Sequence, residues 1–299
     1  MNPLQSAEFR PRILHNEPMS RHTSWRAGGP AEYFFTPHDR DDLSAFLREL
    51  PADMPVYWVG LGSNLLVRDG GLRGVVISAH GVFTRLERRA QTRLYCECSV
   101  PCTRLARQSV RWGLAEAEFF GGIPGTLGGA LAMNAGAYGG ETWKYVVSVE
   151  VIDRGGARRV RQAAEYQPAY RQVQRPANDE WFLAAELQFT NEAAGGDQRV
   201  RELSARRKVT QPLGEWSCGS VFTNPPGDHA ARLIEAAGLK GQRIGGAVVS
   251  TKHANFIINE GSATATELER LILHVQATVE RVHGVRLHPE VRIVGEPAQ

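Results

Sequence analysis

The stretch GGIPGTLGGALAMNAGAYGGE, Gly121 to Glu141, decides the fold class that the sequence predicts. It is dense in glycine and carries no charge until its last residue. Inside a regular element, glycine costs roughly 0.5–1 kcal/mol relative to alanine because it loses more backbone freedom on folding. A second stretch, VGLGSNLLVRDGGLRGVVI (Val59 to Ile77), is also rich in glycine. Such glycines can simply serve tight turns, but two long stretches with embedded Asn64 and Asn134 favour a ligand lying against the backbone.

Neither stretch matches a standard nucleotide-binding motif. GLGSNL has Leu65 where the third glycine of the dinucleotide-binding GxGxxG belongs, and no long helix is predicted after it. GGIPGTLGGA lacks the GK[ST] end of a P-loop. Consecutive backbone N–H groups can still bind anionic oxygens, and Ser63 and Asn64 add side-chain donors. We therefore expect a ligand that contains a pyrophosphate.

Composition limits the remaining classes. The chain has 299 residues, 42% hydrophobic and 22% charged, which is ordinary for a globular protein large enough for two domains. A net charge of +3 suits anionic small molecules but is too weak to predict a nucleic-acid partner. No apolar run approaches the roughly 20 residues of a membrane span, and the first residues lack a signal-peptide core. The four cysteines form no CxxC pair and the nine histidines show no zinc spacing. We expect a cytoplasmic, metal-free protein with reduced thiols and no membrane partner.

Hydrophobic spacing predicts a mixed α+β fold. Helices are expected over 39–50 and 101–112, and strands over 56–60, 74–78, 146–153 and 182–189. The polar, glycine-rich residues 191–198 read as a linker. After it we expect a helix capped by Asp228, then a long helix with a Thr266–Glu269 capping box, a stripe from Leu268 to Val282 and a stop at Gly284. A last strand over about 286–296 completes two predicted domains, 1–192 and 193–299.

The motifs resemble a known family. GLGSNLLVRDGGLRGVVI, FFGGIPGTLGGALAMNAGAYGGE, CGSVFTNPPG, STKHANFIIN and HPEVRIVGE occur in the family's order across almost the whole chain. They are similar to the UDP-N-acetylenolpyruvoylglucosamine reductase (MurB) family, in its shorter subclass without a substrate-covering loop. The first two motifs also resemble the PCMH-type FAD-binding half of vanillyl-alcohol-oxidase-like flavoproteins. The resemblance implies an FAD-binding domain of two α+β subdomains, 1–192, and a smaller α+β substrate-binding domain, 193–299, whose last strand returns to the active site.

The resemblance also implies an activity and a set of residues. The expected reaction is reduction of UDP-N-acetylglucosamine enolpyruvate to UDP-N-acetylmuramate, a peptidoglycan precursor, with FAD as cofactor and NADPH as co-substrate, by a monomer or weak homodimer. The implied catalytic residues are Arg171, Ser220 and Glu290. The implied substrate-binding residues are Tyr170, Lys208, Asn224 and His253. The implied cofactor-binding residues are Gly60, Leu61, Gly62, Ser63, Asn64, Leu65, Gly122, Ile123, Pro124, Gly125, Gly128, Gly129, Asn134, Gly136 and Arg292.

The chemistry explains why these residue types suit their implied roles. Hydride addition to the alkene develops negative charge into the substrate carboxylate, and a guanidinium such as Arg171 can hold a carboxylate with two parallel donors. Ser220 would then protonate the carbon next to the ether oxygen. A carboxyl group at Glu290 close to the substrate carboxylate is expected to have a raised pKa. Each residue also has a plainer interpretation: a surface arginine, a turn serine, and an edge-strand carboxylate paired with Arg292.

The sequence departs from the family pattern at two positions and leaves two alternative functions open. Thr223 stands where the family usually has Lys, and Val173 where it commonly has Ser, which affects expected substrate affinity and the surroundings of Arg171. His253 could be a structural histidine. One rival is a flavoprotein oxidase acting on a sugar or lactone, which the C-terminal motifs disfavour. The other is a non-catalytic nucleotide-binding protein, which the spaced catalytic motifs disfavour.

Overall fold

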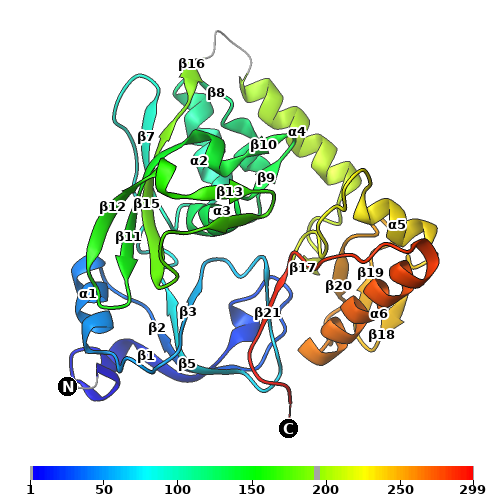
Figure 1. Ribbon diagram of the computed structural model, residues 1–299, viewed down its shortest axis with the longest axis horizontal. Coiled ribbons are helices and arrows are strands. Elements are labelled where there is room, and N and C mark those ends of the chain that lie inside the picture. Colours follow the sequence, from blue (N-terminus) through cyan, green and yellow to red (C-terminus); the bar gives the residue numbers. More distant parts are fainter. Residues whose placement is uncertain (1–2, 192–195, 299) are drawn as a thin grey trace. The chain divides into compact units, whose positions relative to one another are not determined.

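The structure, a computed structural model, describes residues 3–191 and 196–298 (Figure 1). The chain forms two compact units, each built from three segments. The first unit contains the residues up to Leu14, Phe35–Gly60 and Ile77–Arg207. The second contains His15–Phe34, Leu61–Val76 and the residues from Lys208 onward. The mixed α+β class is confirmed, but these compact units are not the two continuous stretches expected from the linker. The division of cofactor and substrate binding at residue 192 stays a prediction.

The first unit is built on an antiparallel sheet in the order β12-β11-β15-β7-β6. Its strands are β6 (Leu86–Arg88), β7 (Arg93–Glu97), β11 (Val146–Asp153), β12 (Arg158–Gln162) and β15 (Glu180–Gln188). Three short antiparallel pairs accompany it: β8 (Leu114–Ala115) with β16 (Thr190–Asn191), β9 (Gly136–Ala137) with β10 (Gly140–Glu141), and β13 (Gln167–Ala169) with β14 (Gln172–Gln174). Its helices are α1 (Arg40–Glu49), α2 (Cys102–Arg111), α3 (Leu127–Met133) and most of α4 (Gly196–Thr210).

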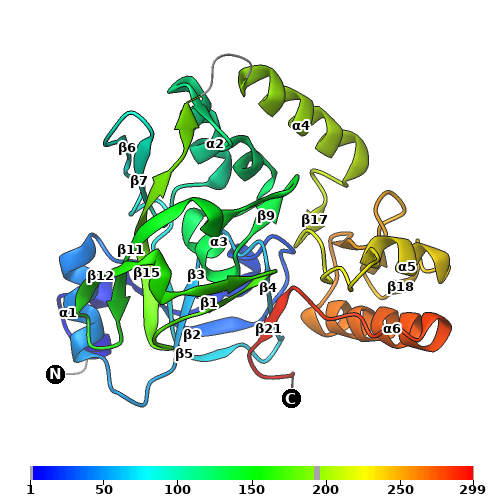
Figure 2. The same cartoon turned by 45° about the horizontal axis from the view of Figure 1, so that its top comes forward.

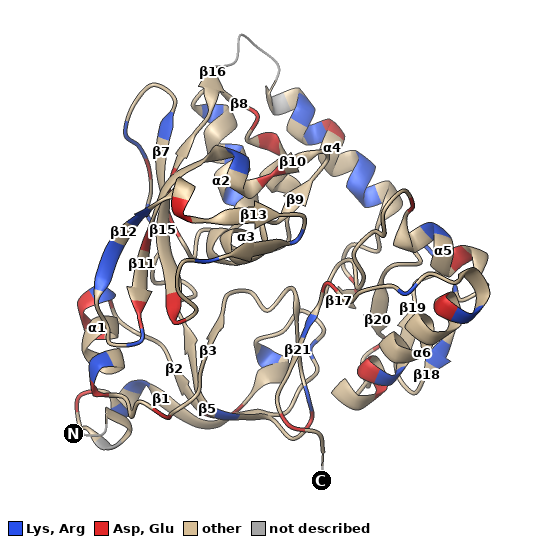
Figure 3. Cartoon of the chain, in the orientation of Figure 1, with Lys and Arg blue, Asp and Glu red and all other residues tan. Residues whose placement is uncertain are grey.

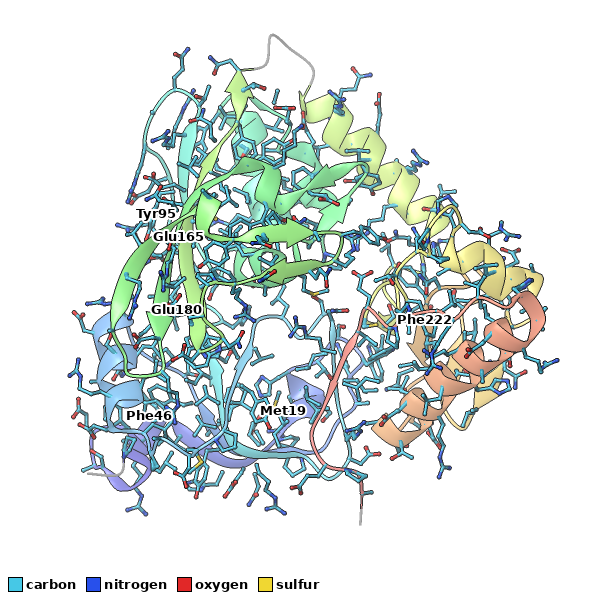
Figure 4. The ribbon with its side chains drawn as sticks, in the orientation of Figure 1. Met19, Phe46, Tyr95, Glu165, Glu180 and Phe222 are labelled. Atoms are coloured by element: carbon cyan, nitrogen blue, oxygen red, sulfur yellow. The ribbon has the colours of Figure 1, made fainter. Side chains whose placement is uncertain are left out.

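Charge and burial fix α1 against this sheet. Asp39 caps the helix by accepting from the Asp41 and Asp42 N–H groups, as its position predicts. Arg40 Nη2 donates to the Tyr95 hydroxyl at 2.5 Å and to Glu97 at 2.9 Å. Tyr95, labelled in Figure 4, is 1% exposed. The core behind the sheet is aromatic and continuous with the glycine-rich stretch, since it includes Phe119, Phe120, Trp143 and Tyr145. The glycine-rich stretch Gly121–Glu141 therefore packs on a buried aromatic core.

The second unit contains a four-stranded antiparallel sheet in the order β17-β20-β19-β18. Its strands are β17 (Trp216–Ser217), β18 (Arg243–Ile244), β19 (Ala247–Val249) and β20 (Ile257–Asn259). Helices α5 (Ala230–Ala236) and α6 (Ala265–His283) lie side by side in Figures 1 and 2 and contact each other. A separate pair joins β4 (Leu65–Val67) to β21 (Arg292–Val294) in parallel, with Arg292 opposite Leu65. The last strand thus lies beside the GLGSNLLV motif.

A third sheet has the order β1-β2-β5-β3. Its strands are β1 (Ile13–Pro18), β2 (Pro30–Phe35), β5 (Leu72–Ser78) and β3 (Val56–Val59). Three of the unit boundaries, at 14/15, 34/35 and 76/77, fall inside β1, β2 and β5. Trp25 shows why residues 15–34 belong to the second unit, because its indole N–H donates to Ile257 O at 2.8 Å and its carbonyl accepts from Asn259 at the same distance.

Several expected helix ends are wrong in detail. The capping box of α6 is Thr264 with Glu267, two residues before the predicted pair. Helix α5 begins after His229 rather than after Asp228. Gly284 ends α6 as predicted, but Val282 at the end of its expected stripe is 47% exposed.

The predicted linker is partly helical. Residues 192–195 lie outside the described residues, and the rest of the linker belongs to α4 from Gly196 onward. This helix carries arginines and lysine along its length (Figure 3) and is fixed to the glycine-rich stretch by a hydrogen bond of 3.0 Å from the Tyr138 hydroxyl to Leu203 O. Among residues 3–191 and 196–298, no helix has the length and apolar character to cross a membrane, and no cluster of His, Cys, Asp and Glu could hold a metal ion.

Candidate active site

Ser220 and Glu290 are close in the second unit because their segments pair. After β17 the chain turns at Gly219, which has a φ of +82°. The next carbonyl after Ser220, Val221 O, accepts the Glu290 N–H at 2.7 Å. One residue further on, Phe222 forms an antiparallel bridge with Pro289. The structure therefore brings two of the three predicted catalytic residues together, both half-buried.

Asn64 joins the first glycine-rich motif to the same segment. Its Nδ2 donates to Glu290 O at 2.9 Å, and its backbone carbonyl accepts the Arg292 N–H at 3.1 Å. Both contacts lie within the second unit. Asn64 thus holds the backbone on both sides of Val291, next to Glu290, whereas the sequence predicted only a cofactor contact for it. The predicted contact of Asn64 with the cofactor stays a prediction.

Arg171 lies in the first unit, at the tip of the β13–β14 hairpin. It is the second residue of a two-residue turn and has a φ of +59°, a conformation that non-glycine residues seldom adopt. Its Nη2 donates to Gly136 O at 2.9 Å, and its guanidinium carbon lies 5.1 Å from the centre of the Tyr170 ring. A half-buried, hydrogen-bonded guanidinium at a strained turn differs from a freely solvated surface arginine.

The Asn134 side chain supports this hairpin through a hydrogen bond to β13. It ends α3 with a φ of +47° and is 2% exposed. Its Nδ2 donates to Ala169 O at 3.1 Å and to Glu141 Oε2 at 3.0 Å, while its Oδ1 accepts the Trp143 N–H at 3.0 Å. Both amide hydrogens are thus used within the protein. The Asn134 side chain therefore holds the segment that carries Arg171, and its predicted contact with the cofactor stays a prediction.

The glycines of the two motifs are required for different physical reasons. A Cβ on Gly62 would lie 2.0 Å from His22 O, and one on Gly136 would lie 2.3 Å from Gly140 O, so packing within the protein requires both. Gly129, by contrast, is exposed in α3, and a Cβ there would meet only Thr126 Oγ1 at 4.0 Å. Since no neighbouring atom demands glycine at 129, a ligand that lies against the backbone is a physical reason for it.

The backbone donors of the second motif are partly occupied. Leu127 N–H donates to Val100 O at 2.9 Å and Gly128 N–H to Cys98 O at 2.8 Å. These two amides anchor α3 to the rest of the unit and do not face an anion. Gly60 meets the same motif, because a Cβ on it would lie 2.8 Å from Thr126 Oγ1. The two glycine-rich motifs therefore approach each other at Gly60 and Thr126, and the backbone of Gly129 stays open for contact with a ligand.

The predicted substrate-binding residues are distributed over both units. Tyr170 is 47% exposed in the first unit. In the second, Asn224 Oδ1 accepts the Ala230 N–H at 3.0 Å and so caps α5, and Lys208 O accepts from Lys252 Nζ at 2.7 Å. The His253 ring packs edge-on against Phe256 at 4.7 Å, and burial lowers the pKa of His253, which keeps the ring neutral. The implied substrate contacts of all four stay predictions.

Sequence reasoning missed Asn255, which is 4% exposed. Its backbone carbonyl accepts the Val221 N–H at 2.9 Å, and its side chain exchanges two hydrogen bonds with Phe222. No spacing rule distinguishes this asparagine inside STKHANFIIN, because its partners are more than thirty residues away in the chain.

Comparisons with known proteins assign the chain to a family. Residues 211–294 match the family model of the UDP-N-acetylenolpyruvoylglucosamine reductase C-terminal domain, and residues 31–160 match an FAD-binding domain model. Over 98% of the chain and 97% of its relative, the sequence is 57% identical to a UDP-N-acetylenolpyruvoylglucosamine reductase of Alkalilimnicola ehrlichii. The chain belongs to this reductase family. A relative with the same name from Nitrosococcus oceani is 53% identical over 100% of both chains.

Membership of the reductase family agrees with the fold. A crystal structure of the reductase (MurB) from Thermus caldophilus superimposes with a TM-score of 0.79 and 31% identity, covering 94% of this chain and 97% of that one. The family resemblance drawn from the motifs is confirmed. The protein is therefore an oxidoreductase with an FAD-binding domain, whose residues 31–160 include both glycine-rich motifs.

Proposed function

We propose that the protein reduces the enolpyruvyl group of UDP-N-acetylglucosamine enolpyruvate to give UDP-N-acetylmuramate, with FAD as cofactor and NADPH as the source of reducing equivalents. This reaction would place it in peptidoglycan precursor synthesis in the cytoplasm. Family membership supports the substrate, because the relatives that match nearly the whole chain carry the name of this reductase.

One contact in the structure supports the proposal for this chain in particular. It is the 2.7 Å hydrogen bond from Glu290 N–H to Val221 O. The bond sets a hydroxyl, at Ser220, and a carboxyl, at Glu290, on neighbouring antiparallel segments. The proposed reaction protonates a carbon next to a carboxylate, and it can use the hydroxyl as proton donor and the carboxyl as hydrogen-bond donor to the substrate carboxylate. Asn255 and Phe222, which lie beside these segments, are 4% and 1% exposed. Buried, closely packed neighbours of this kind give the support that such positioning requires.

The residues then have distinct tasks. Once reduced by NADPH, a bound flavin would supply the hydride that adds to the enolpyruvyl alkene. The Ser220 hydroxyl gives a proton to the carbon next to the ether oxygen. Arg171 stabilises the charge that develops on the substrate carboxylate; losing one such donor typically costs about 10²–10³ in rate. Glu290 orients the same carboxylate by a hydrogen bond. The open backbone at Gly129 and the glycines of the first motif would hold the cofactor.

The test separates the two halves of the reaction. In a stopped-flow experiment, purified protein should show a flavin spectrum that NADPH bleaches and the enolpyruvyl sugar nucleotide restores. Ser220→Ala should leave bleaching by NADPH within about twofold and slow the restoration by a factor of about 10²–10⁴, the range for positioned proton donors. Ser217→Ala is a matched control, because Ser217 is also half-buried and lies in β17 just before the turn. A colourless protein that does not take up FAD would refute the proposal, as would an undiminished Ser220→Ala.

A further inference from the structure

Among the described residues, the segment that carries Ser220 has no paired strand on the side opposite Glu290, and a single residue, Asn255, fills that place. Strand β17 ends at Ser217, and the chain leaves the four-stranded sheet at the Gly219 turn. The two residues after Ser220, Val221 and Phe222, are 0% and 1% exposed, so their backbone polar groups need partners within the protein. Phe222 is labelled in Figure 4.

Asn255 provides those partners. Asn255 O accepts the Val221 N–H at 2.9 Å, Asn255 Oδ1 accepts the Phe222 N–H at 3.0 Å, and Asn255 Nδ2 donates to Phe222 O at 2.8 Å. A carboxamide carries a donor and an acceptor side by side, which is the pattern that the backbone of a neighbouring strand would offer. One residue therefore holds three backbone groups, and we call this set of contacts the Asn255 clamp.

On its other side, the clamped segment is bonded to Glu290. Val221 O accepts Glu290 N–H at 2.7 Å, and Thr223 N–H donates to His288 O at 2.9 Å. A continuous series of hydrogen bonds thus runs from Asn255 through Val221 to Glu290. A shift of the Val221–Phe222 segment would change the separation of Ser220 and Glu290, because Val221 is the residue between them in this series.

We propose that Asn255 is a positioning residue that fixes Ser220 relative to Glu290 for proton transfer. The inference rests on the proposed function, since it takes the roles of those two residues from there. Asn255 itself touches neither reacting group. Its amide defines where the Ser220 hydroxyl lies, and a displacement of about 1 Å in such a group can cost about 10²-fold in rate.

The test compares Asn255→Asp with a matched asparagine. Asn255→Asp keeps the acceptor for Phe222 N–H but places a carboxylate oxygen against Phe222 O. Asn259 is the control, because it is 3% exposed, donates to Trp25 O at 2.8 Å, and accepts from Gly261 and Ala263 N–H groups. Asn259→Asp therefore disturbs an equally buried amide in the same unit without touching the clamped segment. Asn255→Ser, which removes both side-chain bonds without adding charge, serves if the aspartate variant does not fold.

Two readouts decide the matter. Hydrogen exchange followed by mass spectrometry should show faster exchange over residues 218–224 in the Asn255 variants and not in Asn259→Asp, a measurement that needs no cofactor. In stopped flow, the Asn255 variants should be reduced by NADPH within about twofold of wild type, while their oxidation by the enolpyruvyl sugar nucleotide slows about 10²-fold. The solvent deuterium isotope effect on that oxidation should also rise, because proton transfer becomes limiting.

Three results would overturn the inference. The first is oxidation within threefold of wild type in a variant whose 218–224 exchange has increased. The second is equal slowing in Asn259→Asp, which would indicate general loss of stability. The third is unchanged exchange over 218–224. Failure of the proposed function is distinguishable, because it would be seen in the wild-type enzyme as no oxidation by the sugar nucleotide.

Discussion

Replacing Asn134 tests how the first unit holds the hairpin that carries Arg171. Asn134→Ala removes the hydrogen bonds to Ala169 O, Glu141 Oε2 and the buried Trp143 N–H. The first two bonds are worth about 1 kcal/mol each, and an unsatisfied buried N–H costs about 1–3 kcal/mol. Alanine at a φ of +47° adds about 1–2 kcal/mol of backbone strain. We expect Asn134→Ala to lower the free energy of unfolding by about 4–7 kcal/mol, from these hydrogen-bond and strain costs together.

Asn134→Gly separates the two contributions. Glycine accepts a positive φ without strain, so the glycine variant should be more stable than the alanine variant by about 1 kcal/mol while still lacking the amide contacts. The measurement is urea unfolding followed by far-ultraviolet circular dichroism. Asn134→Asp keeps the acceptor for Trp143 N–H but loses both donors and faces the Glu141 carboxylate, so it should be destabilised as well. A glycine variant as stable as wild type would show that the amide contacts do not support the hairpin, and equal stability of the alanine and glycine variants would refute the strain argument.

Four further predictions follow from other contacts. Asp69→Ala should lower the free energy of unfolding by about 1–2 kcal/mol, since Asp69 caps α6 by accepting the Ala265 and Thr266 N–H groups, and thermal unfolding checks this. Glu290→Gln should keep far more turnover than Glu290→Ala in a steady-state NADPH assay, and equal losses would contradict a hydrogen-bonding role. The His253 contribution to stability should be full above pH 6.5 and be lost as the pH falls through its lowered folded pKa, so His253→Gln should flatten the stability–pH curve between pH 7 and 5. Burial raises the pKa of Cys98 to about 12, and all four thiols are buried, so none should react with a thiol reagent before unfolding.

Local features of the fold were predictable because their causes are local. Asp39 is followed by acidic residues and a 3.6-residue apolar repeat, and the helix begins where that pattern predicts. Strand β11 covers the predicted residues Val146–Asp153 because its β-branched residues suit a half-buried sheet. The α6 capping box was misplaced by two residues because Thr264 and Thr266 present similar local patterns. Tertiary structure distinguishes them, since Thr266 N–H and hydroxyl donate to Asp69.

The site could be predicted only as a set of residue types. The motifs that carry Ser220 and Glu290 were recognisable, but their hydrogen-bonded proximity depends on residues about seventy positions apart. Asn64 and Asn134 were noticed as polar residues among glycines, yet their amides bond to Glu290 O and Ala169 O, which no local pattern reveals. Asn255 was missed for the same reason. Polar residues that support a site from within are recognised by their partners, and the partners are known only once the chain is folded.

The parallel pairing of β4 with β21 has a consequence for synthesis of the chain on the ribosome. Leu65–Val67 are translated more than two hundred residues before their partner Arg292–Val294. The first unit has all its segments once Arg207 has left the exit tunnel, whereas the second also needs the residues from Lys208 onward. Nascent Leu65–Val67 must therefore wait without their parallel partner while the residues between the two strands are translated. Slower elongation over those residues would lengthen this exposure of an unpaired strand edge and increase aggregation.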